Sequence, residues 1–531
     1  MSRSPAFVLE SELTPARFAE VGRPGGAFCR ADGGFVALTS SFDRLYWPAR
    51  AVYAGHRIRH RVSLYDGELT ERIAVFDGAE FSIHDVAFHP RRSVVAIATG
   101  DYDGGWMFEG ALLLWNWQTG ESISVLSESR EVTRVRFRED GSLDVLLSPR
   151  DEGDPAIEDD PFETYLGGTL SDLRPFQELG LRASASDPRV AGFTAVEPAR
   201  LGFDVGSLSD AAQDRAWRDV LGGREFEQRH RVWDVDWSEP ERILAVHDEC
   251  LVEAWTPGGD RSLRIQSSER RVQVLRTRDR AIVNALTDGE RAQRPATRST
   301  LYEVGLASIT QVTSFDEAVL CSTDSTGRVL CRDTGDPMRS RTSRDRILDP
   351  SLRTVWSGDL GHYDCFNHHL RVDGGEGLFF LEGSPSSKVL CRWSNAKVVE
   401  RCSWDVDGVS YLNAAACLAR NDLLVRFAEL YDPDPNRFVG SVDGLDLRTG
   451  ARKWTRSISA PATTLALLGD RLVYGLTDGA FGAMDAATGE TLYEERLQVD
   501  GVDSVVLSLA AQGDRVACGT IDGRLLVFRS R

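Results

Sequence analysis

Short apolar runs rich in β-branched residues recur along the 531-residue chain, and this recurrence restricts the folds that are open to it. Each run has the length of a β-strand, and most are bounded by Gly, Asp or Ser. The runs are GFVALTSS (34–41), SVVAIATG (93–100), SLDVLLSP (142–149), RILAVHDE (242–249), AIVNALTD (281–288), AVLCSTDS (318–325), GLFFLEGS (377–384), DLLVRFAE (422–429), RLVYGLTDG (471–479) and RVACGTIDG (515–523). Their starts lie mostly about 40–60 residues apart, which is the spacing of one four-stranded unit with its loops. The pattern predicts an all-β repeat array.

A polar turn of similar composition follows several of these runs. It has the sequences WNWQTGE (115–121), LDLRTGA (445–451) and MDAATGE (484–490). Because Gly adopts positive φ without steric cost, each Thr-Gly pair predicts a tight turn between the third and fourth strands of a unit. A four-stranded unit cannot bury both of its faces alone, so we expect neighbouring units to stack and cover one another.

These residues resemble two families of repeat proteins. The segment from Trp115 to Gly120 resembles the WD40 sequence Trp-Asp-x-x-Thr-Gly, with Asn116 in place of Asp, and HDVAFHP (84–90) resembles the start of a WD40 repeat. The turns at 445–454 and 484–490 resemble those of quinoprotein-like (PQQ-like) repeats. Both resemblances imply a β-propeller built from four-stranded blades.

The number of units bears on the domain organisation. We count about ten or eleven units, whereas single propellers usually have four to eight blades. We therefore expect two packed propellers, over residues 1–265 and 266–531, with one large propeller as the alternative. The last run belongs to a blade with three strands, and residues 5–13 form a strand-like segment that we expect to complete it. Such pairing removes an open sheet edge.

Residues 150–230 interrupt the pattern. They begin with the acidic, Pro-rich run RDEGDPAIEDDPFETY, and Ser209 or Asp210 could cap a short helix that ends at Gly222-Gly223. We predict a partly helical insertion in the first propeller. It is either a binding element, as long structured insertions often are, or a solvated linker with a helix packed on the ring.

Charge and cysteine usage limit the surroundings and partners of the protein. The formal net charge of −19 argues against a general binder of nucleic acid or anionic membranes, and no apolar run is long enough to span a bilayer. Nine cysteines without a CxxC pair, and an N-terminus without a signal-peptide core, predict reduced thiols in a cytoplasmic protein. Lysine occurs only three times, which we attribute to the codon bias of a GC-rich bacterial genome.

Chemical signatures are weak. The segment 362–369 holds three His, one Asp and one Cys, but its spacing matches no zinc template, and Gly361-His362 resembles a structural WD40 dipeptide. Asp432-Pro-Asp434-Pro-Asn436 imitates the start of a calcium loop but has Arg437 where Gly is required. Nucleophile, metalloprotease and phosphate-loop motifs are absent, as is the adjacent Cys pair of quinoprotein dehydrogenases. We predict no catalytic residue, metal ligand or cofactor.

Two basic segments stand out from the acidic background and are the candidate partner-binding sites, together with one tryptophan of the insertion. The alternative is that the basic segments are solvated loops of an Arg-rich protein. The residues are Arg57, Arg59 and Arg61; Arg339, Arg341, Arg344 and Arg346; and Trp217. Arginine clusters on loops can grip phosphates or acidic partners.

The function that these features favour is a non-enzymatic interaction scaffold or regulatory subunit of a bacterial signalling or defence assembly, with another protein as its partner. Two alternatives stay open. One is a hydrolase or lyase with its site in the central channel of a propeller, and the other is a phosphate or nucleic-acid contact through the Arg-rich loops.

Overall fold

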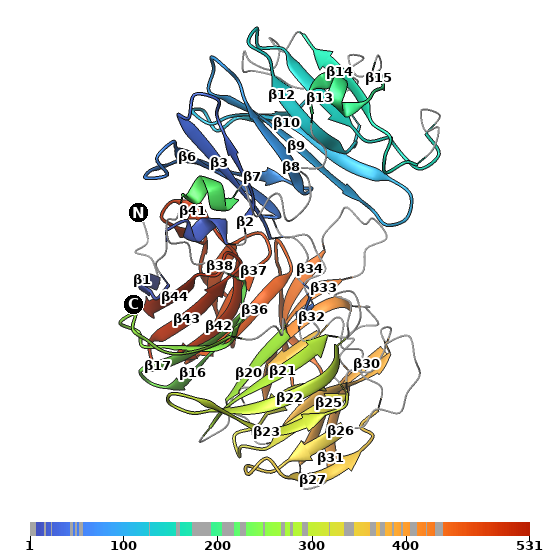
Figure 1. The fold of residues 1–531 in the computed structure, drawn as a ribbon. Coiled ribbons are helices and arrows are strands. Elements are labelled where there is room, and N and C mark those ends of the chain that lie inside the picture. Colours follow the sequence, from blue (N-terminus) through green and yellow to red (C-terminus); the bar gives the residue numbers. More distant parts are fainter. Residues whose placement is uncertain are drawn as a thin grey trace. The chain divides into compact units, whose positions relative to one another are not determined.

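The structure is a computed structural model of the chain, and it divides into two compact units (Figure 1). Unit 1 comprises residues 1–19, 44–56 and 229–531, and unit 2 comprises residues 20–43 and 57–228. The description covers the chain apart from residues 1–6, 15–16, 23, 43–45, 48–49, 52–56, 127, 155–159, 172–192, 204–216, 223–229, 248–249, 267–270, 277–279, 289–295, 318, 334–344, 362–367, 372–376, 385–386, 395–396, 404–410, 421 and 431–438. Among the described residues, no helix combines the length and the apolar character needed to cross a bilayer.

Unit 2 contains three four-stranded antiparallel sheets in chain order. The first is β2 (Pro24–Cys29), β3 (Phe35–Ser41), β6 (His60–Asp66) and β7 (Arg72–Ala79); the second is β8 (Ile83–Phe88), β9 (Val94–Tyr102), β10 (Phe108–Asn116) and β11 (Ser122–Ser124); the third is β12 (Val132–Phe137), β13 (Leu143–Leu147), β14 (Leu166–Leu170) and β15 (Thr194–Ala195). Two short 3-10 helices, η1 (Ala19–Val21) and η2 (Pro198–Leu201), and a helical turn at residues 217–221 complete the described elements of this part of the chain.

Unit 1 contains seven sheets of three to five strands. They are β16 (Val232–Glu239), β17 (Arg242–His247), β18 (Cys250–Trp255) and β19 (Arg261–Gln266); β20 (Arg271–Arg276), β21 (Ala281–Asp288), β22 (Ala296–Val304) and β23 (Ile309–Phe315); β24 (Val319–Thr323), β25 (Val329–Asp333), β26 (Asp345–Leu348) and β27 (Thr354–Gly358); β29 (Leu378–Ser384), β30 (Ser387–Ser394) and β31 (Lys397–Ser403); β28 (His368–Arg371), β32 (Tyr411–Arg420), β33 (Leu423–Leu430), β34 (Gly440–Asp446) and β35 (Arg452–Ser457); β36 (Ala462–Leu468), β37 (Arg471–Leu476), β38 (Ala480–Asp485) and β39 (Thr491–Arg496); and β1 (Phe7–Glu12) with β42 (Val506–Gln512), β43 (Arg515–Thr520) and β44 (Leu525–Ser530). Two small hairpins, β4 (Tyr46–Trp47) with β5 (Arg50–Ala51) and β40 (Gln498–Val499) with β41 (Val502–Asp503), lie outside these sheets.

Each of the ten apolar runs found in the sequence lies in a different one of these ten sheets. The expected all-β fold of four-stranded repeats is therefore confirmed, whereas part of the expected insertion at 150–230 supplies regular strands, and its helix-cap candidates Ser209 and Asp210 lie outside the described residues. The repeated four-stranded antiparallel sheets fit a β-propeller, as both resemblances implied. The assignment of residues 1–265 and 266–531 to two propellers stays a prediction, and the two compact units divide the chain at other points.

Neighbouring sheets of unit 1 bury their faces against each other. The strand β42 lies beside β36 on one side and beside β16 on the other, so the last sheet of the unit packs against the first. The strands β37 and β43 show why this stacking is required: almost every residue in each of them is buried. In an isolated sheet, one face of such a strand would be in water.

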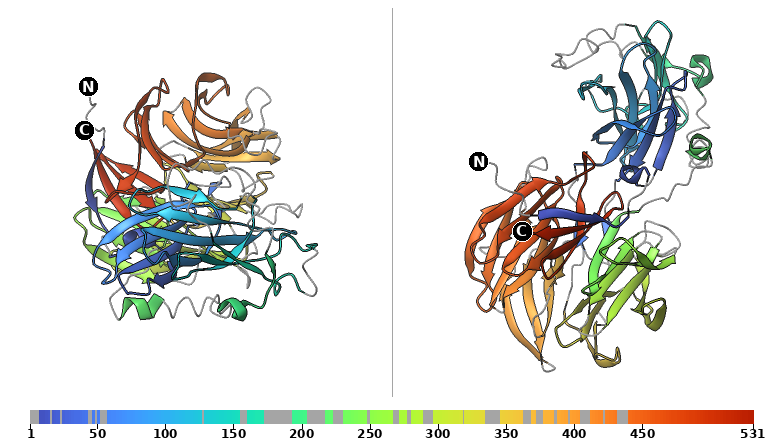
Figure 2. Two further views of the ribbon diagram at one scale, coloured as in Figure 1. Left: turned by 90° about the horizontal axis from the view of Figure 1, so that it is seen from above. Right: turned by 90° about the vertical axis from the view of Figure 1, so that its left-hand side faces the viewer.

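The strand β1 is the outer strand of the last sheet. It pairs antiparallel with β44 from Phe7 to Glu12, and Figure 2 shows this blue strand beside the red C-terminal strands. Phe7 is buried among aromatic rings, with centroids 5.4 Å from Phe481 and 5.7 Å from Tyr493. The Glu10 carboxylate accepts hydrogen bonds of 3.0 and 3.1 Å from Arg515. Residues 7–12 of the segment 5–13 thus pair in the last sheet, and the completion of a propeller blade by this segment stays a prediction.

The three repeated turns share one hydrogen-bond pattern. The Oδ1 atom of Asp485 accepts the backbone N–H groups of Ala487 and Thr488 at 3.0 and 2.8 Å, and the Gly489 N–H donates to the Asp485 carbonyl at 2.8 Å. The turns that start at Asn116 and Asp446 repeat these bonds, and each ends in a glycine of positive φ. These segments are therefore structural turns between the third and fourth strands, as the sequence predicted.

Residues of the expected 150–230 insertion take part in the third sheet of unit 2. The strands β14 and β15 complete that sheet, and Leu201 of η2 lies over it, within 2.7 Å of where a side chain on Gly167 would begin. The Arg136 guanidinium donates to the Leu201 and Gly202 carbonyls and stacks 5.3 Å from the Phe203 ring. Part of this region thus covers the outer face of a sheet.

The pairing of β1 with β44 can be tested through Phe7. Replacing Phe7 with Ala removes a buried ring, and we expect the free energy of unfolding to fall by about 3–4 kcal/mol. The matched control is Leu9→Ala in the same strand, because Leu9 is 41% exposed. We expect this control to change stability by less than about 1 kcal/mol. Urea denaturation measures both, and equal effects of the two variants would contradict the buried position of β1.

A second test uses Gly489, whose φ is +71° and whose hydrogen faces Trp454 of the neighbouring sheet. A Cβ at this position would lie 2.4 Å from the Trp454 ring, whereas a Cβ at Gly469, with φ of +61°, meets nothing within 4 Å. Both substitutions by Ala strain the backbone by about 1 kcal/mol, and Gly489→Ala adds an overpacking cost of about 1–3 kcal/mol. Denaturation midpoints should therefore rank Gly489→Ala as the less stable variant. The reverse order would show that the two sheets do not meet there.

Candidate functional site

The first predicted basic segment is divided between the surface and the interior of unit 2. Arg57 is exposed and Arg59 is half-buried, but Arg61 lies in β6 and is buried. The Arg61 guanidinium pairs with Asp77 at 2.5 and 3.1 Å, donates to the Glu20 carbonyl at 2.9 Å and stacks on Phe42. Arg61 therefore stabilises its own sheet and offers no surface to a partner.

The other predicted residues have different positions. Arg346 in β26 pairs with Glu317 at 2.5 Å and lies over the Phe315 ring. Trp217 begins the helical turn at residues 217–221 and is buried, which favours packing over partner contact. The residues Arg339, Arg341 and Arg344 lie outside the described residues, as do the 432–436 turn and most of the 362–369 cluster. A role in partner binding stays a prediction for all of these arginines.

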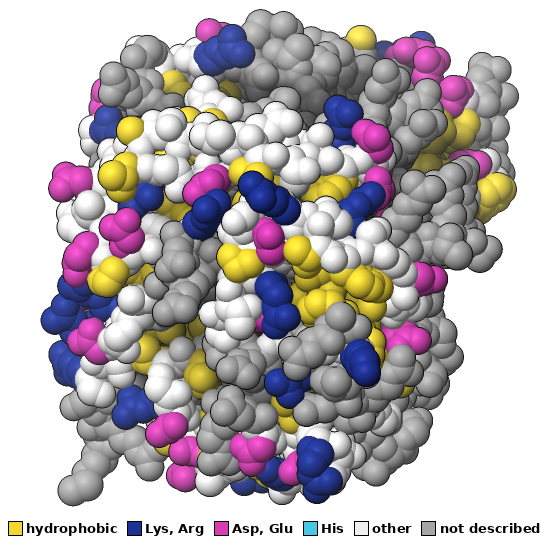
Figure 3. Space-filling model, turned by 90° about the horizontal axis from the view of Figure 1, so that it is seen from below, with side chains coloured by type: hydrophobic (Ala, Val, Ile, Leu, Met, Phe, Trp, Pro, Cys, Tyr) yellow, Lys and Arg dark blue, Asp and Glu magenta, His cyan; other side chains and the backbone are white. Residues whose placement is uncertain are grey.

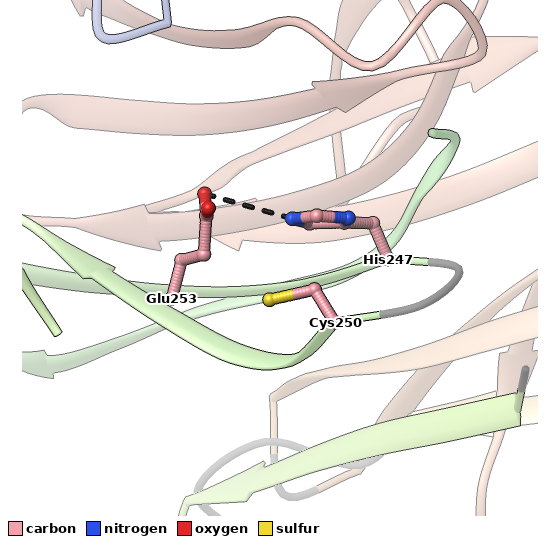
Figure 4. A group of neighbouring side chains, drawn as sticks. All are labelled: His247, Cys250 and Glu253. Atoms are coloured by element: carbon pink, nitrogen blue, oxygen red, sulfur yellow. Dashed lines mark ion pairs between the residues drawn. The ribbon is translucent and has the colours of Figure 1, made fainter. Parts of the chain in front are cut away.

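The structure brings together a cluster that the sequence analysis missed, at the hairpin between β17 and β18 (Figure 4). His247 ends β17, Cys250 begins β18 and Glu253 follows in β18, and their ligand-type atoms lie within 4.8 Å of one another. The His247 Nε2 atom is 3.6 Å from Glu253 Oε2. The regular spacing His-x-x-Cys-x-x-Glu could have indicated this cluster in the sequence. However, a spacing of three residues across a tight hairpin corresponds neither to the face of a helix nor to a standard metal-binding motif.

Glu253 is the centre of this cluster because it is buried and surrounded by cations and donors. Arg261 and Arg264 approach its Oε1 atom at 3.3 and 3.4 Å, and the Trp255 indole N–H donates to Oε2 at 3.0 Å. Burial alone would raise the pKa of Glu253. The bond and charge of His247, the Trp255 donor and the charge of Arg264 outweigh burial and lower this pKa to about 2.

His247 shows the complementary shift. Burial lowers the pKa of its imidazole, but hydrogen bonds to Cys250 and Glu253, together with the charges of these two groups, raise it to about 10. The ring of His230 lies parallel to that of His247, with centroids 6.4 Å apart. At neutral pH the cluster therefore contains an imidazolium paired with a carboxylate, which stabilises the hairpin.

The three donors are chemically suitable for zinc, but their surroundings fit a metal poorly. Zinc would need Glu253 to turn from Arg261, Arg264 and Trp255, which already bind both of its oxygens. A nucleophilic role also fits poorly. Cys250 is buried, with its Sγ atom 3.4 Å from the Ile265 carbonyl oxygen. In addition, the Cys250 thiol and the Glu253 carboxylate approach the same edge of the His247 imidazole. In a catalytic relay, the nucleophile and the carboxylate bind opposite nitrogens of the imidazole.

Comparison with known proteins identifies no family for the chain. No protein-family model matches the chain, and no curated protein matches it either. A structure of Raptor from Chaetomium thermophilum is similar with a TM-score of 0.41 and 10% identity, over 57% of this chain and 28% of that one. The WD40 β-propeller domain of Doa1 is similar with a TM-score of 0.40 and 12% identity, over 57% and 93% of the two chains. The expected likeness of the C-terminal turns to quinoprotein-like repeats stays a prediction.

The ion pair between His247 and Glu253 predicts how this imidazole titrates. With a pKa of about 10, His247 should remain protonated at pH 8, and its NMR signal should not titrate near 6.5. The variant Glu253→Gln removes the carboxylate, so the pKa of His247 should fall. The control Glu303→Gln breaks an exposed pair with Arg280 and should leave the signal unchanged.

The same shifts set the sign of the pH dependence of stability. The contribution of His247 is complete below pH 6.5 and is lost as pH rises to about 10, and that of Glu253 is complete above pH 4.5 and is lost as pH falls to about 2. The free energy of unfolding should therefore decline between pH 6.5 and 10, and less steeply in His247→Gln. Equal slopes in the two proteins would contradict the pair.

Proposed function

We propose that this chain is a non-enzymatic scaffold that presents rigid surfaces to another protein in a bacterial, cytoplasmic assembly. The observation that supports this proposal is that four buried arginines of the sheets are each bound by a carboxylate of the same unit. Besides Arg61, the buried pairs are Arg332 with Asp345 at 3.2 Å, Arg426 with Asp443 at 3.0 Å and Arg524 with Asp522 at 3.5 Å. Groups engaged in this way strengthen a frame and leave recognition to the outer loops.

The cysteines support the same surroundings. The six described free thiols include five that are buried, and Cys321 and Cys331 lie directly opposite in β24 and β25 with their sulfurs 3.6 Å apart. The hydrogen bond with the Cys331 thiol, together with burial, raises the pKa of Cys321, so it is held as an unreactive thiol.

The enzyme alternative would need titratable groups that meet in an accessible cavity. Within the part of the chain that the structure describes, the one cluster of three metal-type ligands is that of His247, Cys250 and Glu253, which is engaged with its own neighbours. The phosphate-binding alternative is weakened because Arg61 and Arg346 are paired. On the face seen in Figure 3, described Lys and Arg side chains lie among Asp and Glu side chains, with hydrophobic patches between them.

The experiment that tests the scaffold is affinity purification of the tagged full chain from its native host, with mass spectrometry and quantitation of what co-elutes. We expect a protein partner in a fixed stoichiometric ratio that survives nuclease treatment. A lone chain carrying a metabolite or metal would instead favour the enzyme. Loss of the co-eluting material on nuclease treatment would favour the nucleic-acid contact.

A further inference from the structure

Unit 2 exposes two large aromatic side chains outside its repeated strands. Trp106, between β9 and β10, is 51% exposed, and Phe162, between β13 and β14, is 55% exposed. Exposed rings of this size are costly in water and are common anchors at protein interfaces.

Trp106 is held in place by its own loop. The Oδ1 atom of Asp103 accepts the backbone N–H groups of Gly105, Trp106 and Met107 at 2.8, 2.7 and 3.0 Å. On the other side, the Glu152 N–H donates to the Trp106 carbonyl at 3.2 Å. The Trp106 ring lies over Gly153, where a Cβ would come within 3.0 Å of it. A ring fixed in this way loses little entropy on binding.

Phe162 is fixed to the same surface. Its N–H donates to Asp160 Oδ1 at 2.9 Å, and its ring lies edge-on to Tyr102 and Phe108 at centroid distances of 5.2 and 5.3 Å. The Tyr102 hydroxyl donates to the Glu152 carboxylate. Glu152 therefore links the two sides, through its backbone to Trp106 and through its side chain to the Tyr102–Phe162 pair.

The surroundings of these rings are strongly acidic. In the described parts of residues 103–106 and 150–163 there are six carboxylates and one cation, Arg150, which pairs with Glu128 at 3.7 Å; a second cation, Arg130, lies 3.9 Å from Asp154. The carboxylates are those of Asp103, Asp151, Glu152, Asp154, Asp160 and Glu163, whereas Asp101 and Glu109 point to the opposite face of β9 and β10 from Tyr102 and Phe108. Carboxylates and an exposed indole face both attract cations.

We propose that this aromatic–acidic surface, made by Tyr102, Trp106, Phe162 and the carboxylates around them, binds a segment of a partner protein in which a large apolar side chain is flanked by Lys or Arg. The inference rests on the scaffold function proposed above and names its docking surface. The negative charge of this surface favours a positively charged partner segment over the other possible occupants. A second copy of this chain would bring its own net charge of −19, and nucleic acid would bring phosphates, to a surface that is already negative.

The test uses three fluorescein-labelled peptide pools with a central Leu-Phe flanked by Lys/Arg, by Ser/Gln or by Asp/Glu. Fluorescence anisotropy with the full chain should show binding of the basic pool, at least about tenfold weaker binding of the neutral pool, and a loss of affinity between about 50 and 300 mM salt. The double variant Trp106→Ser, Phe162→Ser should weaken binding of the basic pool at least about tenfold. Glu163→Gln, which removes one exposed carboxylate, should weaken it by a smaller factor.

The matched control is Leu306→Ser, because Leu306 is 72% exposed on unit 1 and should not affect the basic pool. Equal binding by the double variant would overturn the proposal, since charge alone would then explain the affinity. The proposal would also be overturned if the basic pool did not bind. It would equally be overturned if sedimentation showed a concentration-dependent dimer of the wild-type chain that the double variant does not form. If the native partner co-purifies equally well with the double variant, the scaffold function stands and only this surface is excluded. If the wild-type chain has no partner, the scaffold function itself fails.

Discussion

The structure depends on sheets that are apolar on both faces and so cannot exist singly. In β37 and β43 nearly every side chain is buried, which requires a neighbouring sheet on each side. Where the stack of unit 2 has no further described sheet beside β12–β15, residues 196–203 cover the exposed face instead. Stacking also brings charged groups into the interior, and each buried arginine discussed above has a carboxylate within 3.5 Å. A buried charge without such a partner would be strongly destabilising.

The pairing of buried charged groups with one another distinguishes the side chains that stabilise the fold from those that remain available for binding. The charged cluster at the β17–β18 hairpin has the residue types of a metal or thiol site, but its carboxylate is saturated by Arg261, Arg264 and Trp255. The groups around Trp106 and Phe162 show the opposite arrangement, because hydrogen bonds there hold rings toward solvent. A rigid frame with ordered, exposed aromatic side chains on its loops suits recognition of another chain better than chemistry on a small molecule.

Much of the fold could be predicted from the sequence because strand length, β-branched residues and Thr-Gly turns are local signals. All ten apolar runs are strands, and the Asp485 and Asp446 turns have the expected form. The contacts that side chains make in the folded protein were harder to predict from the sequence. Arg61 was assigned to a basic loop because its neighbours are charged, but Asp77 on the adjacent strand and the Glu20 carbonyl draw it inside. The clusters around His247 and Phe162 depend on pairings across a hairpin and between loops, which a single sequence does not specify.

The position of β1 has a consequence for biosynthesis. The Leu525 N–H donates to the Thr14 hydroxyl, a bond between residues 511 positions apart in the chain. At about 5–20 residues per second, a ribosome needs about 25–100 s to cover that distance. Throughout this time Phe7 and Leu13 have no final partner, so the nascent chain must keep an apolar segment from aggregating while the rest of unit 1 is made. A chain that stops before β44 would therefore leave Phe7–Glu12 without the strand that pairs with them.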